Sequence, residues 1–232
     1  MRQHRWVWFT PVAFAALRII GNQFVEGAVD QRDAPQAFLA SLLADAESFS
    51  IGMYLIGLSG LAFLLFAWAL REVLRQAEGS GWAEAGFAGG VAWGAVHVAA
   101  ALLGATAPVL ADYLGDAEGA RLVTNLELAT APLALTLFGV FALGNGLALR
   151  RTAVIPRWLA CAGALLGGLL VVTAALQTAA DPTVSRSEEE VHHVVTFVTG
   201  IAFAGLIPLW TIATGIVLVR GEGRRTAVAG RG

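Results

Sequence analysis

Residues 50–71 read SIGMYLIGLSGLAFLLFAWALR, and no charged side chain occurs in them before Arg71. About 20 helical residues, each rising 1.5 Å, cross the ~30 Å hydrocarbon core of a bilayer. Lipid offers no hydrogen-bond partners, so a segment without strand-like alternation must satisfy its backbone groups as a helix. Residues 50–71 therefore predict a transmembrane helix.

Further apolar runs of similar length lie on both sides of this stretch. Together they predict six spans, at residues 6–25, 50–71, 86–109, 127–149, 155–178 and 194–219. Of all residues 57% are hydrophobic and only 14% are charged, whereas soluble domains average about 25% charged. We therefore predict an all-α polytopic membrane protein, with one six-helix bundle in residues 1–220 and a flexible cytoplasmic tail in 221–232. We expect the first run to remain a span and not to be cleaved as a signal peptide.

The charges are distributed unevenly about these runs. If the spans alternate in direction, 11 of the 15 arginines fall on one side together with only 4 of the 17 acids. The positive-inside rule then places both termini in the cytoplasm of a bacterium, with the spans in its cytoplasmic (inner) membrane. Helix dipoles account for part of this pattern, because acids favour helix N-termini and arginines favour C-termini.

The outer connection from Gly27 to Ser48 is the longest, and it predicts a short amphipathic helix. Its apolar face consists of Phe38, Leu39, Leu42, Leu43 and Ala46. We expect this face to lie along the outer membrane surface or over the mouth of the bundle. A similar but weaker pattern covers Asp112 to Asn125.

Arg18 stands inside the first run, and Asn22 and Glu26 follow it on one helical face. A charge inside a bilayer costs at least ~2.5 kcal/mol unless it pairs, snorkels or faces water. We expect Arg18 to pair with an acid, either Glu26 or one on a neighbouring helix, or to bind an anion or lipid headgroup from outside. The predicted ligand-binding residues are Arg18, Asn22, Glu26, Glu47, His97, Asn125 and Glu127.

His97 lies at the centre of the third run. A neutral histidine bonded to another helix is one interpretation, and proton transfer or ligand contact is the other. We predict no cofactor and no metal site. His193 lies ~20 Å along the bilayer normal from the level of His97, which is too far for a pair of haem ligands. Cys161 is the sole cysteine, which excludes an internal disulfide.

Several segments in their order along the chain resemble a known family. They are the outer segment 34–48, the sequence LREVLR at 70–75 and the sequence LRRTAVIPRWL at 149–159, in which Pro-Arg-Trp is the most specific piece. The chain is similar over residues 10–220 to the DUF4386 type, six-helix membrane proteins of actinobacteria and other bacteria. The arginine near the start of the first span in that family is here Arg18, well inside the span. The resemblance implies a six-helix inner-membrane bundle, and it assigns no activity and no functional residues.

Three classes of function remain open. The first is a binding or accessory membrane protein that holds a small amphipathic ligand or lipid headgroup in an outward-facing polar cavity. The second is a small-solute or proton-coupled transporter, which would use His97. The third is an intramembrane enzyme acting on a lipid or isoprenoid, with Glu47 or Glu127 as a buried acid. No known catalytic motif occurs in the sequence, which argues against an enzyme. We expect membrane lipids and a small amphipathic molecule as partners, and no nucleic acid.

Overall fold

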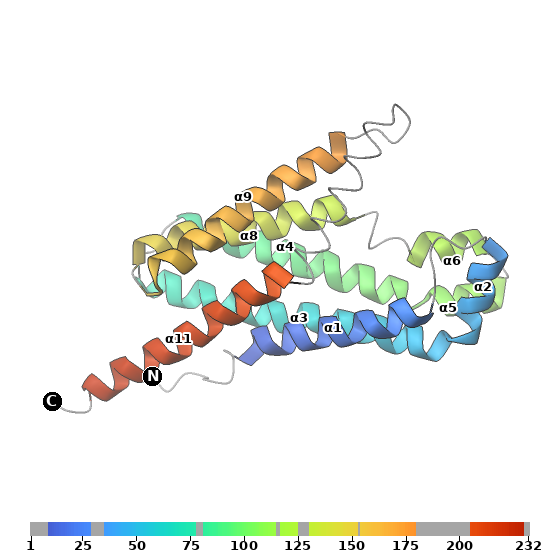
Figure 1. Cartoon of the computed structure of the whole chain (residues 1–232), viewed down its shortest axis with the longest axis horizontal. Coiled ribbons are helices and arrows are strands. Elements are labelled where there is room, and N and C mark those ends of the chain that lie inside the picture. The colour runs from blue at the N-terminus through green and yellow to red at the C-terminus, as the bar shows by residue number, and fades with distance from the viewer. Residues whose placement is uncertain are drawn as a thin grey trace. The chain divides into compact units, whose positions relative to one another are not determined.

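A computed structural model describes residues 9–28, 35–77, 81–114, 117–124, 130–152, 154–179 and 205–229. Its helices, with the labels of Figure 1, are α1 (Thr10–Ala28), α2 (Pro35–Ala44), α3 (Ala46–Ala77), α4 (Gly81–Gly104), α5 (Ala107–Leu114), α6 (Ala117–Thr124), α8 (Ala131–Thr152), α9 (Arg157–Ala179) and α11 (Ile207–Ala229). Within these ranges no residue is in a strand. The predicted all-α class is confirmed.

Four helices are long and apolar enough to cross a membrane. They cover Ala46–Arg75, Gly81–Tyr113, Pro132–Thr152 and Arg157–Leu176. They coincide with the second to fifth predicted spans and indicate a membrane protein. Helix α1 covers most of the first predicted span. A shorter apolar helix, Ile207–Arg220, covers the described part of the sixth. The count of six spans and the placement of the termini stay predictions.

Two helix boundaries differ from the prediction. The third predicted span, residues 86–109, lies within the candidate span Gly81–Tyr113, but the helix is interrupted inside it, because α4 ends at Gly104 and α5 begins at Ala107. Pro108 explains the break, because it has no N–H to donate to the Gly104 carbonyl and its ring would clash with that group. At the other end of the chain, α11 continues to Ala229 and does not end near residue 220.

The described helices gather in two compact units. Unit 1 takes residues 63–93 of α3 and α4 together with α8, α9 and α11. Unit 2 takes residues 13–62 and 94–131, and therefore contains nearly all of α1, the rest of α3 and α4, and the short helices α2, α5 and α6.

The core of unit 1 is aromatic. Phe63 packs edge-on against Trp93 at 4.5 Å and against Phe141 at 4.8 Å between ring centroids. Phe141 in turn meets Trp210 of α11 at 6.1 Å, and the Trp210 indole donates a hydrogen bond of 3.1 Å to the Leu159 carbonyl. Edge-to-face pairs of this kind add roughly 0.5–1.5 kcal/mol each to the burial of the rings. These contacts connect α3, α4, α8 and α11.

Unit 2 ends in a cap of three short helices, α2, α5 and α6, which lie together in Figure 1. Phe38 and Leu42 of α2 are fully buried there against Ala107, Ala111 and Ala120. The apolar face predicted for residues 34–48 therefore packs mainly on protein, although Leu43 stays 40% exposed. The guanidinium of Arg121 on α6 lies 5.5 Å above the Phe38 ring of α2, and this contact connects the two helices.

Candidate functional site

The main polar contact of unit 2 joins α1 to α4. The Arg18 side chain donates from Nη1 to Nε2 of His97 over 3.2 Å. Arg18 is half-buried, whereas only 6% of the His97 surface is exposed. A positively charged side chain therefore lies beside a buried imidazole.

Ser59 of α3 completes this cluster. Its hydroxyl donates 2.6 Å to the Ile56 carbonyl, and its oxygen lies 3.4 Å from Nε2 of His97. A guanidinium can only donate, so Nε2 must accept and the imidazole proton sits on Nδ1. This assignment follows from the geometry of the contacts. In this tautomer the 3.4 Å approach of Ser59 is a contact and not a hydrogen bond.

Small residues hold the three helices close enough for these contacts. A Cβ on Gly52 of α3 would lie 2.8 Å from the carbonyl oxygen of Gly21 on α1. A Cβ on Gly60 would lie 2.8 Å from Val98 and 3.1 Å from the His97 ring. Close backbone approach through small residues is the usual means of packing helices in lipid. Gly52 therefore brings Arg18 toward the bundle, and Gly60 leaves the space in which the imidazole lies.

The structure brings together Arg18 and His97 of the seven predicted site residues. Asn22 is half-buried one turn further along α1, and Glu26 is exposed on the same helix. Glu47 is exposed in the first turn of α3. Asn125 and Glu127 lie outside the described residues. The site as a whole stays a prediction.

Sequence reasoning missed the contact between Arg18 and His97. Among the described residues the structure gives Arg18 a partner that the sequence did not suggest, a histidine 79 residues away in the chain, and its pairing with an acid stays a prediction. Sequence reasoning also missed Ser59. Its signal was present, because Ser59 is a polar residue flanked by Gly57 and Gly60 in an apolar stretch, which is typical of a close helix contact.

The exposure of Glu47 bears on the enzyme hypothesis. A catalytic acid in the membrane needs burial to keep its proton near neutral pH. Glu47 is exposed in the structure, and its role as an acid stays a prediction. Within the described residues no three His, Cys, Asp or Glu side chains come together as a metal site would require.

Comparison with known proteins places the chain in a family. The family described as Domain of unknown function (DUF4386) matches residues 12–215, and the chain belongs to it. The match covers α1 to α6, α8, α9 and the first part of α11. No curated protein and no solved structure matches the chain.

Proposed function

We propose that this DUF4386 membrane protein binds the polar head of a small amphipathic molecule at Arg18 and His97, in a site that opens to the outer side of the membrane. The observation that carries the proposal is the 3.2 Å contact between the two side chains. The imidazole of His97 holds the guanidinium in position. An ionisable side chain inside a predicted span is a functional hypothesis by default.

The surroundings of Arg18 suit an amphipathic ligand. Ile19 and Ile20 follow it directly on α1 and are 51% and 49% exposed. Phe24, one turn further on, is 39% exposed. A polar head held by the guanidinium would thus leave its apolar part along the same helix. Arginine suits the recognition of phosphate or carboxylate groups, because its N–H donors form a planar fork.

The test is to compare molecules that co-purify with the wild-type protein and with Arg18→Ala, by native mass spectrometry and extraction. A hydrogen bond to a charged group contributes about 1.5–3 kcal/mol, so retention should fall roughly tenfold or more. Arg18→Lys should lose most of it, since a lysine lacks the fork. Gln23→Ala, an exposed change on the same helix, is the matched control and should retain the molecule.

A purely structural role for the cluster predicts a different result. Arg18→Ala would then lower the melting temperature while the co-purified species stayed the same as in the wild type. That outcome contradicts binding at this site. Retention lost equally in Gln23→Ala would also contradict it.

Proton-coupled transport is the second candidate, and the geometry around His97 favours it specifically. His97 lies midway along the candidate span Gly81–Tyr113. Protonation would turn Nε2 from an acceptor into a donor, which would break the contact with Arg18 and favour Ser59 Oγ, 3.4 Å away. Proton or solute flux in liposomes that disappears in His97→Ala would support transport. Equal flux in His97→Ala and the wild type would contradict it.

A further inference from the structure

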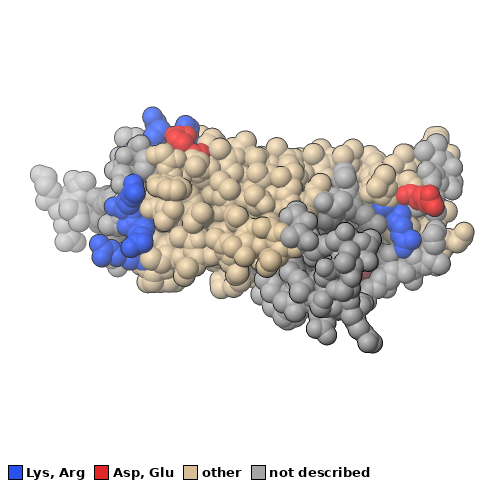
Figure 2. All heavy atoms as spheres, turned by 90° about the horizontal axis from the view of Figure 1, so that it is seen from above, with Lys and Arg blue, Asp and Glu red and all other residues tan. Residues whose placement is uncertain are grey.

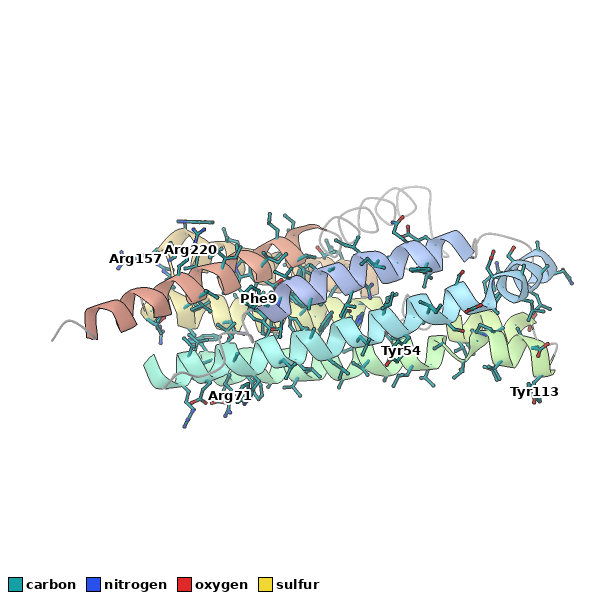
Figure 3. All side chains as sticks on the ribbon, turned by 90° about the horizontal axis from the view of Figure 1, so that it is seen from below. Phe9, Tyr54, Arg71, Tyr113, Arg157 and Arg220 are labelled. Carbon is teal, nitrogen blue, oxygen red and sulfur yellow. The ribbon has the colours of Figure 1, made fainter. Side chains whose placement is uncertain are left out.

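Six arginines of the described part of unit 1 lie at one end of it. They come from the C-terminal parts of α3, α8 and α11 and from the start of α9, and they are Arg71, Arg75, Arg150, Arg151, Arg157 and Arg220. Figure 2 shows the blue side chains together at its left end, and Figure 3 labels three of them there. In Figure 1 these helix ends lie on the same side of the unit.

Two of these arginines have acidic partners. Arg71 forms a two-pronged ion pair with Glu84 of α4, at 2.9 and 3.0 Å, and lies 4.8 Å above the Phe87 ring. Arg75 pairs with Glu72 on its own helix at 3.0 Å. These contacts connect the end of α3 to the start of α4 and balance the charge there.

The turn between α8 and α9 is different. Arg150, Arg151 and Arg157 are all exposed, and among the described residues none of them has an ion pair. Arg150 and Arg151 are favoured by the dipole at the C-terminus of α8. The helix dipole disfavours Arg157, because Arg157 is the first residue of α9 and the N-terminus of a helix repels a cation. No acid in the first turn of α9 compensates its charge. The turn therefore carries positive charge that its own helices do not balance.

An apolar stripe starts beside this charge. Trp158 is 68% exposed, and it is followed at helical spacing on α9 by residues that are also largely exposed: Leu165 75%, Leu169 47%, Val172 56% and Leu176 50%. From Trp158 to Leu176 the stripe is ~27 Å long, close to the ~30 Å thickness of the hydrocarbon core. Tryptophan is enriched where the headgroups begin. The α8–α9 turn thus offers a positively charged surface, and the exposed side of α9 next to it offers an apolar surface.

We propose that the α8–α9 turn binds the phosphate of an anionic phospholipid through Arg150, Arg151 and Arg157, with the acyl chains along the exposed stripe of α9. One leaflet contributes ~15 Å of hydrocarbon, so the acyl chains reach from Trp158 to about Leu169. Charge complementarity selects an anionic headgroup, and each arginine near an anionic surface adds roughly fivefold to the affinity. This surface is independent of Arg18 and His97.

The experiment titrates the full chain in detergent with phosphatidylglycerol and with phosphatidylcholine of the same acyl chains, using native mass spectrometry. The wild type should prefer phosphatidylglycerol. The variant R150Q/R151Q/R157Q should lose that preference, with phosphatidylglycerol bound roughly tenfold or more weakly. The matched control is R71Q/R75Q, which removes two arginines of the same end that already have acidic partners, and its preference should stay.

Two more variants keep the test decisive. If the triple glutamine variant does not fold, Arg157→Gln alone should weaken phosphatidylglycerol roughly fivefold, and R150K/R151K/R157K should keep the preference because the charge remains. Arg18→Ala should leave it unchanged, which separates this surface from the proposed ligand site. Equal binding of the two lipids by the wild type would overturn the proposal. So would a preference that survives the glutamine changes or that is lost equally in R71Q/R75Q.

Discussion

At the scale of single residues, the polar cluster of unit 2 depends on glycines as much as on its polar side chains. Arg18 lies one turn from Gly21, and at Gly21 the backbone of α1 comes close to that of α3 at Gly52. The guanidinium reaches His97 only if this approach is kept. The position of a charged side chain on α1 thus depends on residues that have no side chain.

We therefore expect Gly52→Ala to destabilise the protein. The new Cβ would lie 2.8 Å from the Gly21 carbonyl oxygen and 2.9 Å from Phe24 Cβ, and the backbone of α1 would have to move. Overpacking of this kind costs roughly 1–3 kcal/mol. The melting temperature in detergent should fall, and retention of the co-purified molecule should fall with it because Arg18 shifts away from His97.

Gly168→Ala on α9 is the matched control. A Cβ there meets nothing within 4 Å, so the change should be neutral or stabilise the helix by roughly 0.5–1 kcal/mol. If both alanine variants melted at the wild-type temperature, close packing of α1 on α3 would be refuted.

At the scale of elements, the cap of α2, α5 and α6 shares one core with the adjoining parts of α3 and α4, to which Phe49, Met53 and Ala101 belong. Phe38 fills it completely and also carries the contact with Arg121. Truncation of a buried phenylalanine costs about 3–5 kcal/mol. We predict that Phe38→Ala loosens the cap, so limited proteolysis should cut the α5–α6 region faster than in the wild type. Leu43→Ala on the same helix, where the side chain is 40% exposed, should leave the cleavage rate nearly unchanged, and equal cleavage of both variants would argue against this core.

The elements themselves could be predicted well from the sequence, because hydropathy and length determine which segments cross lipid. Residues 50–71 lie wholly inside α3, and the short helix expected after Gly27 is α2. The contact between Arg18 and His97 could not be predicted in the same way. This contact depends on which helices are neighbours, and the amino-acid composition of an apolar helix does not reveal which other helix it packs against. The break at Gly104 was predictable in principle from Pro108, since a proline affects the residue four positions before it.

At the scale of the whole molecule, the distribution of arginines predicts an orientation that can be measured. Gln36 of α2 and Gly81 at the start of α4 are both exposed, and the candidate span Ala46–Arg75 lies between them in the chain. If the arginine side is cytoplasmic, Gln36 faces outward and Gly81 faces inward. Cys161 is the only cysteine to replace, so single-cysteine variants are easily made in a Cys161→Ser background.

The cell wall, and any outer membrane, is first removed from the cells, and the cytoplasmic membrane is left intact. A membrane-impermeant maleimide should then label Gln36→Cys at once. It should label Gly81→Cys only after the inner membrane is permeabilised, because the bilayer otherwise separates reagent and thiol. Cys161→Ser alone should stay unlabelled in both conditions. Labelling of Gly81→Cys and not of Gln36→Cys in intact cells would reverse the orientation. It would also place the exposed arginines Arg150, Arg151 and Arg157 at the outer leaflet, so that the phospholipid they are proposed to bind would come from that leaflet.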